Sequence, residues 1–137
     1  MSEPILVIPC SGIGKAFGTI GREATYIVVE ELQKGKSDTL CLSLITMGDE
    51  EALQRVKSHR CITIDGCPLE CAKKNLILSG SQVATSFRVV DLLREYRTLK
   101  PQSVTFLDED GEKLAQILAE KVALRIDELN QEEGGTA

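Results

Sequence analysis

The stretch CITIDGCP, which runs from Cys61 to Pro68, carries the clearest structural signal in the sequence. Its first five residues form a short run rich in β-branched side chains, which is typical of a strand buried on both faces. Glycine and proline then indicate a turn, and Pro68 suits the first position of a helix, which we predict over residues 69–78. A strand, a turn and a helix in this order form the repeating unit of α/β proteins.

The same alternation of strand and helix extends in both directions from this stretch. We predict further strands at residues 5–8, 39–42 and 83–90, the last with a break, and helices at residues 19–32, 50–58, 91–96 and 109–130. This order predicts a three-layer α/β/α fold, in which a mainly parallel sheet of about four strands lies between two helix layers. We expect residues 1–131 to form one domain and residues 132–137 to form a flexible tail.

Composition and charge argue against some classes of binding partner. The chain has 137 residues, a formal net charge of −5 and no Trp. Nucleic acid and anionic membrane surfaces bind basic proteins, so we expect neither as a partner. We recognise no signal peptide, and no apolar stretch approaches the ~20 residues of a membrane span, so we expect a cytoplasmic protein. The sequence does not indicate a protein partner.

Five cysteines are the strongest chemical signal in the chain. Thiols stay reduced in the cytoplasm, so these cysteines indicate metal binding or redox chemistry before disulfides. Cys67 would cap the helix that starts at Pro68, and Cys71 would lie one turn later on nearly the same face. Cys10 directly follows the first predicted strand, and Cys41 lies in or beside the second. Because the carboxyl ends of parallel strands share one edge of the sheet, we expect these segments to converge there.

Four thiolates suit tetrahedral Zn²⁺ or, with the same ligands, an iron–sulfur cluster. Cys61 lies six residues before Cys67, at the other end of its strand, so we interpret it as a buried structural thiol. Two alternatives stay open from the residues alone. The cysteines could be inert core residues, or Cys67 could be the nucleophile of a thiol–disulfide enzyme with Cys71 or Cys10 as its partner.

The residues around these cysteines resemble one known family. The string IDGCPLECAKK at residues 64–74, together with Cys10-Ser11-Gly12, resembles the DGC-domain proteins, which are small prokaryotic proteins proposed to bind zinc. The resemblance extends from about Val7 to the segment around Asp91. It implies four metal ligands, with Cys10 in the Cys-Ser-Gly position, Cys67 in the Asp-Gly-Cys motif, Cys71 after that motif, and Cys41 as the fourth. It implies a metal ion and no particular reaction.

Three other features have simpler interpretations. The segment from Gly12 to Gly18 follows a strand as phosphate-binding loops do, but it lacks their spacing, and we interpret it as backbone that wraps closely around Cys10. A small anionic ligand held near Lys15 is the alternative. We interpret Asp65 as a turn residue that stabilises the following helix, with a role beside the metal or as a general base as alternatives. The only histidine, His59, is expected in a solvated loop. The sequence leaves open whether the protein is an enzyme and does not identify a catalytic residue.

Overall fold

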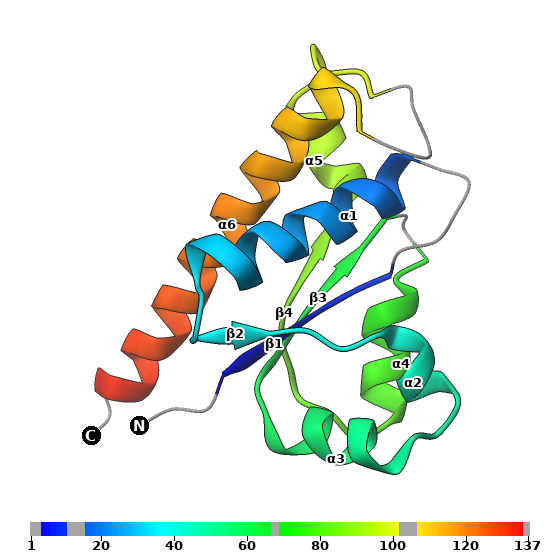
Figure 1. The fold of residues 1–137 in the computed structure, drawn as a ribbon, viewed down its shortest axis with the longest axis vertical. Coiled ribbons are helices and arrows are strands. Elements are labelled where there is room, and N and C mark those ends of the chain that lie inside the picture. Colours follow the sequence, from blue (N-terminus) through cyan, green and yellow to red (C-terminus); the bar gives the residue numbers. More distant parts are fainter. Residues whose placement is uncertain (1–3, 11–15, 67–68, 102–106, 136–137) are drawn as a thin grey trace.

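A four-stranded, all-parallel sheet forms the centre of the fold (Figure 1). The computed structural model describes residues 4–10, 16–66, 69–101 and 107–135. Within these ranges the strands lie in the order β2-β1-β3-β4. Their bounds are Ile5–Pro9 for β1, Ser37–Asp38 for β2, Cys61–Asp65 for β3 and Val83–Arg88 for β4. The predicted α/β class is confirmed.

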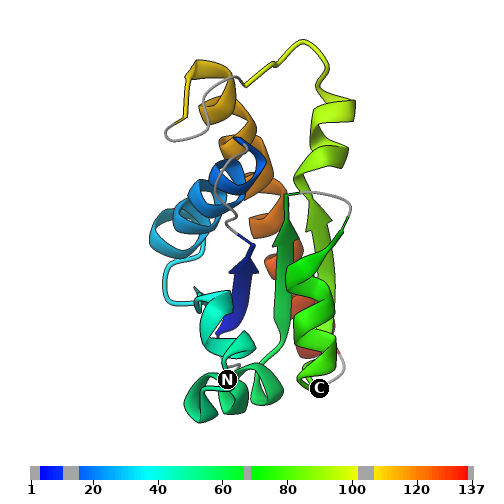
Figure 2. The ribbon, with the colours of Figure 1, turned by 90° about the vertical axis from the view of Figure 1, so that its right-hand side faces the viewer.

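Helices cover both faces of this sheet (Figures 1 and 2). They are α1 (Ala16–Ile27), its π-helical continuation η1 (Val28–Leu32), α2 (Leu42–Thr46), α3 (Glu50–Ser58), α4 (Cys71–Leu78), α5 (Val89–Glu95) and α6 (Glu109–Gly135). Along β1, Ile5 and Val7 pack with α1, η1, α5 and α6, whereas Leu6 and Ile8 pack with α2, α3 and α4. Because successive strand side chains point to opposite faces, one apolar strand serves two cores.

The chain leaves the two central strands toward opposite faces of the sheet. β1 leads into α1 in the first helix layer, and β3 leads into α4 in the second. A topological switch point therefore lies between the carboxyl ends of these neighbouring strands. In open parallel sheets, ligand sites form in the crevice at such a point.

Two predicted elements near the cysteines are wrong in detail. The second strand is Ser37–Asp38 rather than residues 39–42, and it pairs with Ile5 and Leu6 through its backbone. The apolar residues after it begin α2 instead, which buries Ile45 in the second core. Helix α4 begins at Cys71 rather than at residue 69, because Glu70 has a left-handed backbone (φ 55°) that a right-handed helix cannot include.

Several more element boundaries differ from prediction, among them the start of α1 at Ala16 rather than at residue 19, and one helix start agrees with it. β4 ends at Arg88, and Val89 begins α5, where its side chain is buried in the first core. α6 continues to Gly135, beyond the predicted end at residue 130. α3 is confirmed, with the carboxylate of Asp49 accepting a hydrogen bond from the backbone N–H of Ala52 at 2.9 Å. In the part of the chain that the structure describes, no helix has both the length and the apolar character that a membrane crossing requires.

Candidate metal centre

Cys10 lies directly beyond β1, at the carboxyl edge of the sheet. Its side chain is half-buried, and its backbone N–H donates to the carbonyl of Ile64 at 2.9 Å. This bond extends the pairing of β1 with β3 by one residue, so Cys10 is held beside the end of β3. Two predicted site residues, Cys67 and Lys15, lie outside the described residues.

Gly66 brings the end of β3 against the start of α1. A Cβ atom built on Gly66 would lie 3.1 Å from the Cβ of Phe17 and 3.3 Å from the backbone N of Gly18. Only a residue without a side chain fits this approach without moving its neighbours. The chain that enters Cys67 therefore touches the first turn of the helix that follows Cys10 and the glycine-rich segment.

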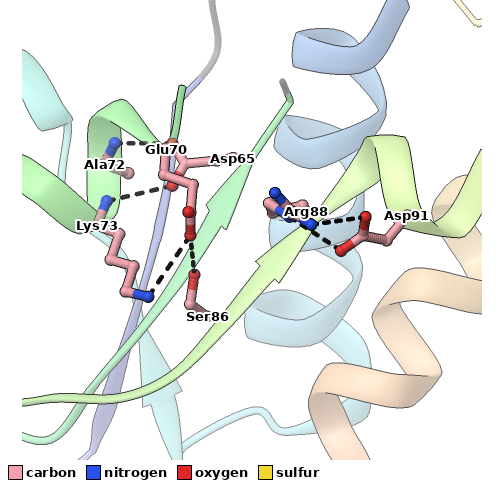
Figure 3. Close-up of polar contacts among 7 residues, drawn as sticks. All are labelled: Asp65, Glu70, Ala72, Lys73, Ser86, Arg88 and Asp91. Atoms are coloured by element: carbon pink, nitrogen blue, oxygen red, sulfur yellow. Dashed lines mark hydrogen bonds and ion pairs between the residues drawn. The ribbon is translucent and has the colours of Figure 1, made fainter. Parts of the chain in front are cut away.

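Asp65 ties the end of β3 to the start of α4 (Figure 3). Its Oδ1 accepts a hydrogen bond from the N–H of Ala72 at 2.7 Å, and its Oδ2 accepts one from the N–H of Lys73 at 3.2 Å. The first N–H groups of a helix have no partner inside the helix, and a carboxylate there is also favoured by the helix dipole. Burial raises the pKa of Asp65, although these two backbone hydrogen bonds oppose the rise. The interpretation of Asp65 as the stabiliser of the helix start is confirmed.

Cys71 is the first residue of α4, and its thiol is exposed. The sequence placed it one turn into the helix, and the left-handed backbone of Glu70 accounts for the difference. The carboxylate of Glu70 accepts a weak hydrogen bond from the hydroxyl of Ser86 at 3.5 Å and lies 3.6 Å from Nζ of Lys73 (Figure 3). A left-handed backbone costs a residue with a side chain about 1–2 kcal/mol, so contacts of this kind are needed to stabilise the turn before Cys71.

Cys41 lies at the start of α2, three residues beyond the end of β2. Its exposed Sγ is 2.9 Å from the hydroxyl of Ser43. The hydrogen bond with this hydroxyl is the main cause that lowers the pKa of Cys41, which enriches the thiolate form that metals bind. α2 packs against α4, the helix that begins with Cys71. Cys41 and Cys71 thus belong to neighbouring helices on the same face of the sheet.

Cys61 lies at the opposite end of β3 from this edge. It is fully buried in the second core, where its Sγ accepts a hydrogen bond from the hydroxyl of Ser81 at 3.3 Å. Burial raises the pKa of Cys61, which disfavours the thiolate. These observations agree with its interpretation as a structural thiol.

The described cysteines do not form a complete set of metal ligands. Among residues 4–10, 16–66, 69–101 and 107–135, no three Cys, His, Asp or Glu side chains are close enough together to hold a metal ion. Cys10, Cys41 and Cys71 therefore make no preformed three-ligand site. Their donor chemistry still fits Zn²⁺ or an iron–sulfur cluster, since each offers one soft sulfur atom. The set of four that includes Cys67 stays a prediction.

Sequence reasoning missed a polar cluster beside Asp65, on β4 and at the start of α5. Arg88 is the register partner of Asp65 on the neighbouring strand. Its guanidinium donates two hydrogen bonds to the carboxylate of Asp91, at 2.9 and 3.0 Å (Figure 3). The spacing of three residues between Arg88 and Asp91 is visible in the sequence. Their place next to the Asp-Gly-Cys turn depends on strand pairing, which the sequence does not reveal.

Comparison with known proteins identifies one family. A family model described as the DGC domain matches residues 6–118. The matched region begins in β1 and ends within α6, so it includes all of the sheet but its first residue, and helices of both layers. No curated protein and no solved structure gives a significant match. The resemblance drawn from the Asp-Gly-Cys motif and from Cys10 is confirmed.

Proposed function

The chain belongs to the DGC-domain family, and from this premise we propose that it is a metal-binding protein. In this proposal Zn²⁺ is held by the thiolates of Cys10, Cys41, Cys67 and Cys71 at the carboxyl edge of the sheet. Soft sulfur ligands suit zinc, and an iron–sulfur cluster with the same ligands is the alternative cofactor.

The contact of Gly66 with Phe17 is the observation that supports this proposal most strongly. It brings the Asp-Gly-Cys turn against the helix that follows the segment of Cys10. The same two segments flank the switch point between β1 and β3, where open parallel sheets bind their ligands. Cys10 and the residue before Cys67 thus lie on the two segments that flank this switch point.

The positions of the other two ligands favour a carrier or sensor role over a purely structural one. Cys41 and Cys71 are exposed, and the described cysteines do not form a three-ligand cluster. The loops would therefore have to close around the ion when it binds. Four thiolates would fill a tetrahedral shell and leave no position for a reacting water, which disfavours metal catalysis.

We further propose where the protein is located and which ligands it binds, from the chemistry of the four thiols. A reducing cytoplasm would keep all four thiols available for metal. The metal ion is the main ligand in this proposal, and a small anion near Lys15 is a second, lesser one. The net charge of −5 supports the absence of nucleic acid and membrane partners.

A thiol–disulfide enzyme is the second candidate function. It is favoured by the exposed thiol of Cys71 at the first position of α4, where it is accessible to a reacting disulfide. Cys67 would act as the nucleophile and Cys71 as its partner. Their spacing of three intervening residues departs from the two that are typical of such enzymes.

Metal analysis of protein purified without added zinc tests both candidates. We expect about one zinc ion per chain that stays bound on gel filtration, as in other four-cysteine sites. Cys67→Ser should abolish this zinc, whereas Cys61→Ser, the matched control in the buried core, should retain it. A brown protein with visible absorbance would identify an iron–sulfur cluster instead. Metal-free protein with a readily cycled disulfide between Cys67 and Cys71 would overturn the proposal.

A further inference from the structure

Asp65 replaces the residue that would ordinarily cap α4. The residue at the capping position is Glu70, whose side chain accepts none of the first N–H groups of the helix in the described structure. Asp65 accepts two of them instead, although it lies seven residues before Ala72 and eight before Lys73. The backbone N–H groups of Ala72 and Lys73 in the first turn of α4 are therefore capped by a side chain at the end of β3, and not by the side chain of the residue that precedes the helix.

These two hydrogen bonds fall on the residues that directly follow Cys71. The carboxylate of Asp65 is almost completely buried, with 1% of the residue exposed, so the two bonds are shielded from water. The neighbouring strand ends beside it, where the N–H of Cys10 donates to the carbonyl of Ile64. Asp65 thus connects the start of the helix that carries Cys71 with the pair of strands that positions Cys10.

We propose that Asp65 is a positioning residue for the metal centre. It holds Cys71 at the carboxyl edge of the sheet, the edge at which Cys10 also lies, so that the Cys71 thiolate can take part in the proposed site. The first two residues of the Asp-Gly-Cys motif then have separate tasks, since Asp65 positions the helix that begins with Cys71 and Gly66 permits the contact with α1. This inference rests on the proposed function, and it concerns a residue that does not itself bind the metal.

Variants of Asp65 test the proposal against a matched control. Asp65→Ala removes both hydrogen bonds, and we expect it to weaken zinc binding by about 10- to 100-fold, as the loss of an orienting partner does in other zinc sites. Asp65→Asn should have a smaller effect, because its carbonyl can still accept from Ala72 while its amide nitrogen cannot accept from Lys73. Asp49→Ala removes the cap of α3 in the same helix layer, where no cysteine begins the helix, and should leave zinc affinity unchanged.

Two measurements on the same proteins show whether position is what changes. Zinc affinity is measured by competition with a chromogenic chelator, and the number of bound thiolates by the thiolate-to-metal absorption of the cobalt-loaded protein. We expect Asp65→Ala to lose part of this absorption and Asp49→Ala to keep all of it. In the metal-free protein, hydrogen exchange at the amides of Ala72 and Lys73 should become faster in Asp65→Ala only.

The outcomes separate this inference from the function on which it rests. Wild-type protein that binds no zinc overturns the proposed function, and the inference falls with it. Wild-type protein that binds zinc while Asp65→Ala binds it equally well overturns the inference alone. Equal losses of affinity in Asp65→Ala and Asp49→Ala also overturn it, because the effect would then be general destabilisation. If circular dichroism shows that Asp65→Ala is unfolded, Asp65→Asn decides, and unchanged affinity in this variant refutes the role.

Discussion

Replacing Gly66 by alanine should both destabilise the protein and weaken metal binding. The added methyl group would lie 3.1 Å from Cβ of Phe17, 3.3 Å from its carbonyl carbon and 3.3 Å from the backbone N of Gly18. All three atoms are backbone or directly attached to it, so no side-chain rotation relieves the contact. Either the start of α1 moves away from β3, or the Asp-Gly-Cys turn moves away from α1.

The required movement sets the size of the effect. Carbon atoms attract each other at separations of ~3.5 Å or more, so the contact with Phe17 must open by about 0.4 Å. Overpacking of this kind in a close-packed region costs about 1–3 kcal/mol. With a urea dependence of about 2 kcal/mol/M for a domain of this size, a loss of about 2 kcal/mol lowers the unfolding midpoint by about 1 M.

Urea unfolding of the metal-free protein measures this shift, and a zinc competition titration of the same variant measures the effect on the site. Gly35→Ala is the matched control. Gly35 has φ +82° and no atom within 4 Å of an added Cβ, so alanine there should cost about 1 kcal/mol through backbone strain alone and leave zinc affinity unchanged. A Gly66→Ala protein with the wild-type midpoint and wild-type zinc affinity would refute the close packing and its role in the site.

Three further predictions concern side chains outside this contact. Cys61→Ala should lower the unfolding free energy by about 1–2 kcal/mol, because it leaves a cavity in the core. Metal analysis should show the wild-type zinc content, and a loss of zinc would make Cys61 a ligand. In metal-free protein near neutral pH, iodoacetamide should label Cys41 roughly tenfold faster than Cys61, because the hydrogen bond with Ser43 lowers the pKa of Cys41 and burial raises that of Cys61. Peptide mass spectrometry measures both labelling rates. Ser43→Ala should slow the labelling of Cys41, and equal rates at Cys41 and Cys61 in the wild-type protein would contradict the reasoning. Burial alone would raise the pKa of Asp38, but hydrogen bonds, chiefly from Arg55, bring it below its usual value. The ionised Asp38 therefore stabilises the fold fully above about pH 4, and this stabilisation is lost as the pH falls through the lower pKa of the folded state. Asp38→Asn should lower the unfolding free energy by about 0.5 kcal/mol at neutral pH and leave it unchanged in strong acid. Urea unfolding at a series of pH values measures this difference.

The sequence predicts the central part of this fold because its signals there are local. The apolar run Ile5–Ile8 and the stretch Cys61–Asp65 form strands that are buried on both faces, so their hydrophobicity alone identifies them. The capping carboxylate of Asp49 marks the start of α3 in the same local way. β2 is different, because its two residues are polar and are held in the sheet by backbone pairing with β1. No pattern of side chains marks such a strand.

The positions of the candidate site residues could also be predicted from the sequence only in part. The place of Cys10 after β1 and the core position of Cys61 follow from strand boundaries, which the sequence reveals. Glu70 has a left-handed backbone that no local signal in the sequence marks, and so the start of α4 at Cys71 could not be predicted from helix signals alone. The sequence predicts that Asp65 stabilises the helix start, but only the structure reveals its hydrogen bonds with the two residues after Cys71.

α6 extends the folded domain beyond the region that the family model matches. The family match ends at residue 118, whereas α6 continues to Gly135 and runs nearly the full length of the molecule (Figure 1). Beyond residue 118, α6 places four further side chains in the first core: Ala119, Val122, Ile126 and Leu129. Gln33 donates to the carbonyl of Ala123 at 3.0 Å, and Arg60 donates to the side chain of Asn130 at 2.7 Å. An expression fragment cut at the end of the family match would therefore leave an open hydrophobic face, and the boundaries for producing this domain should be taken from α6.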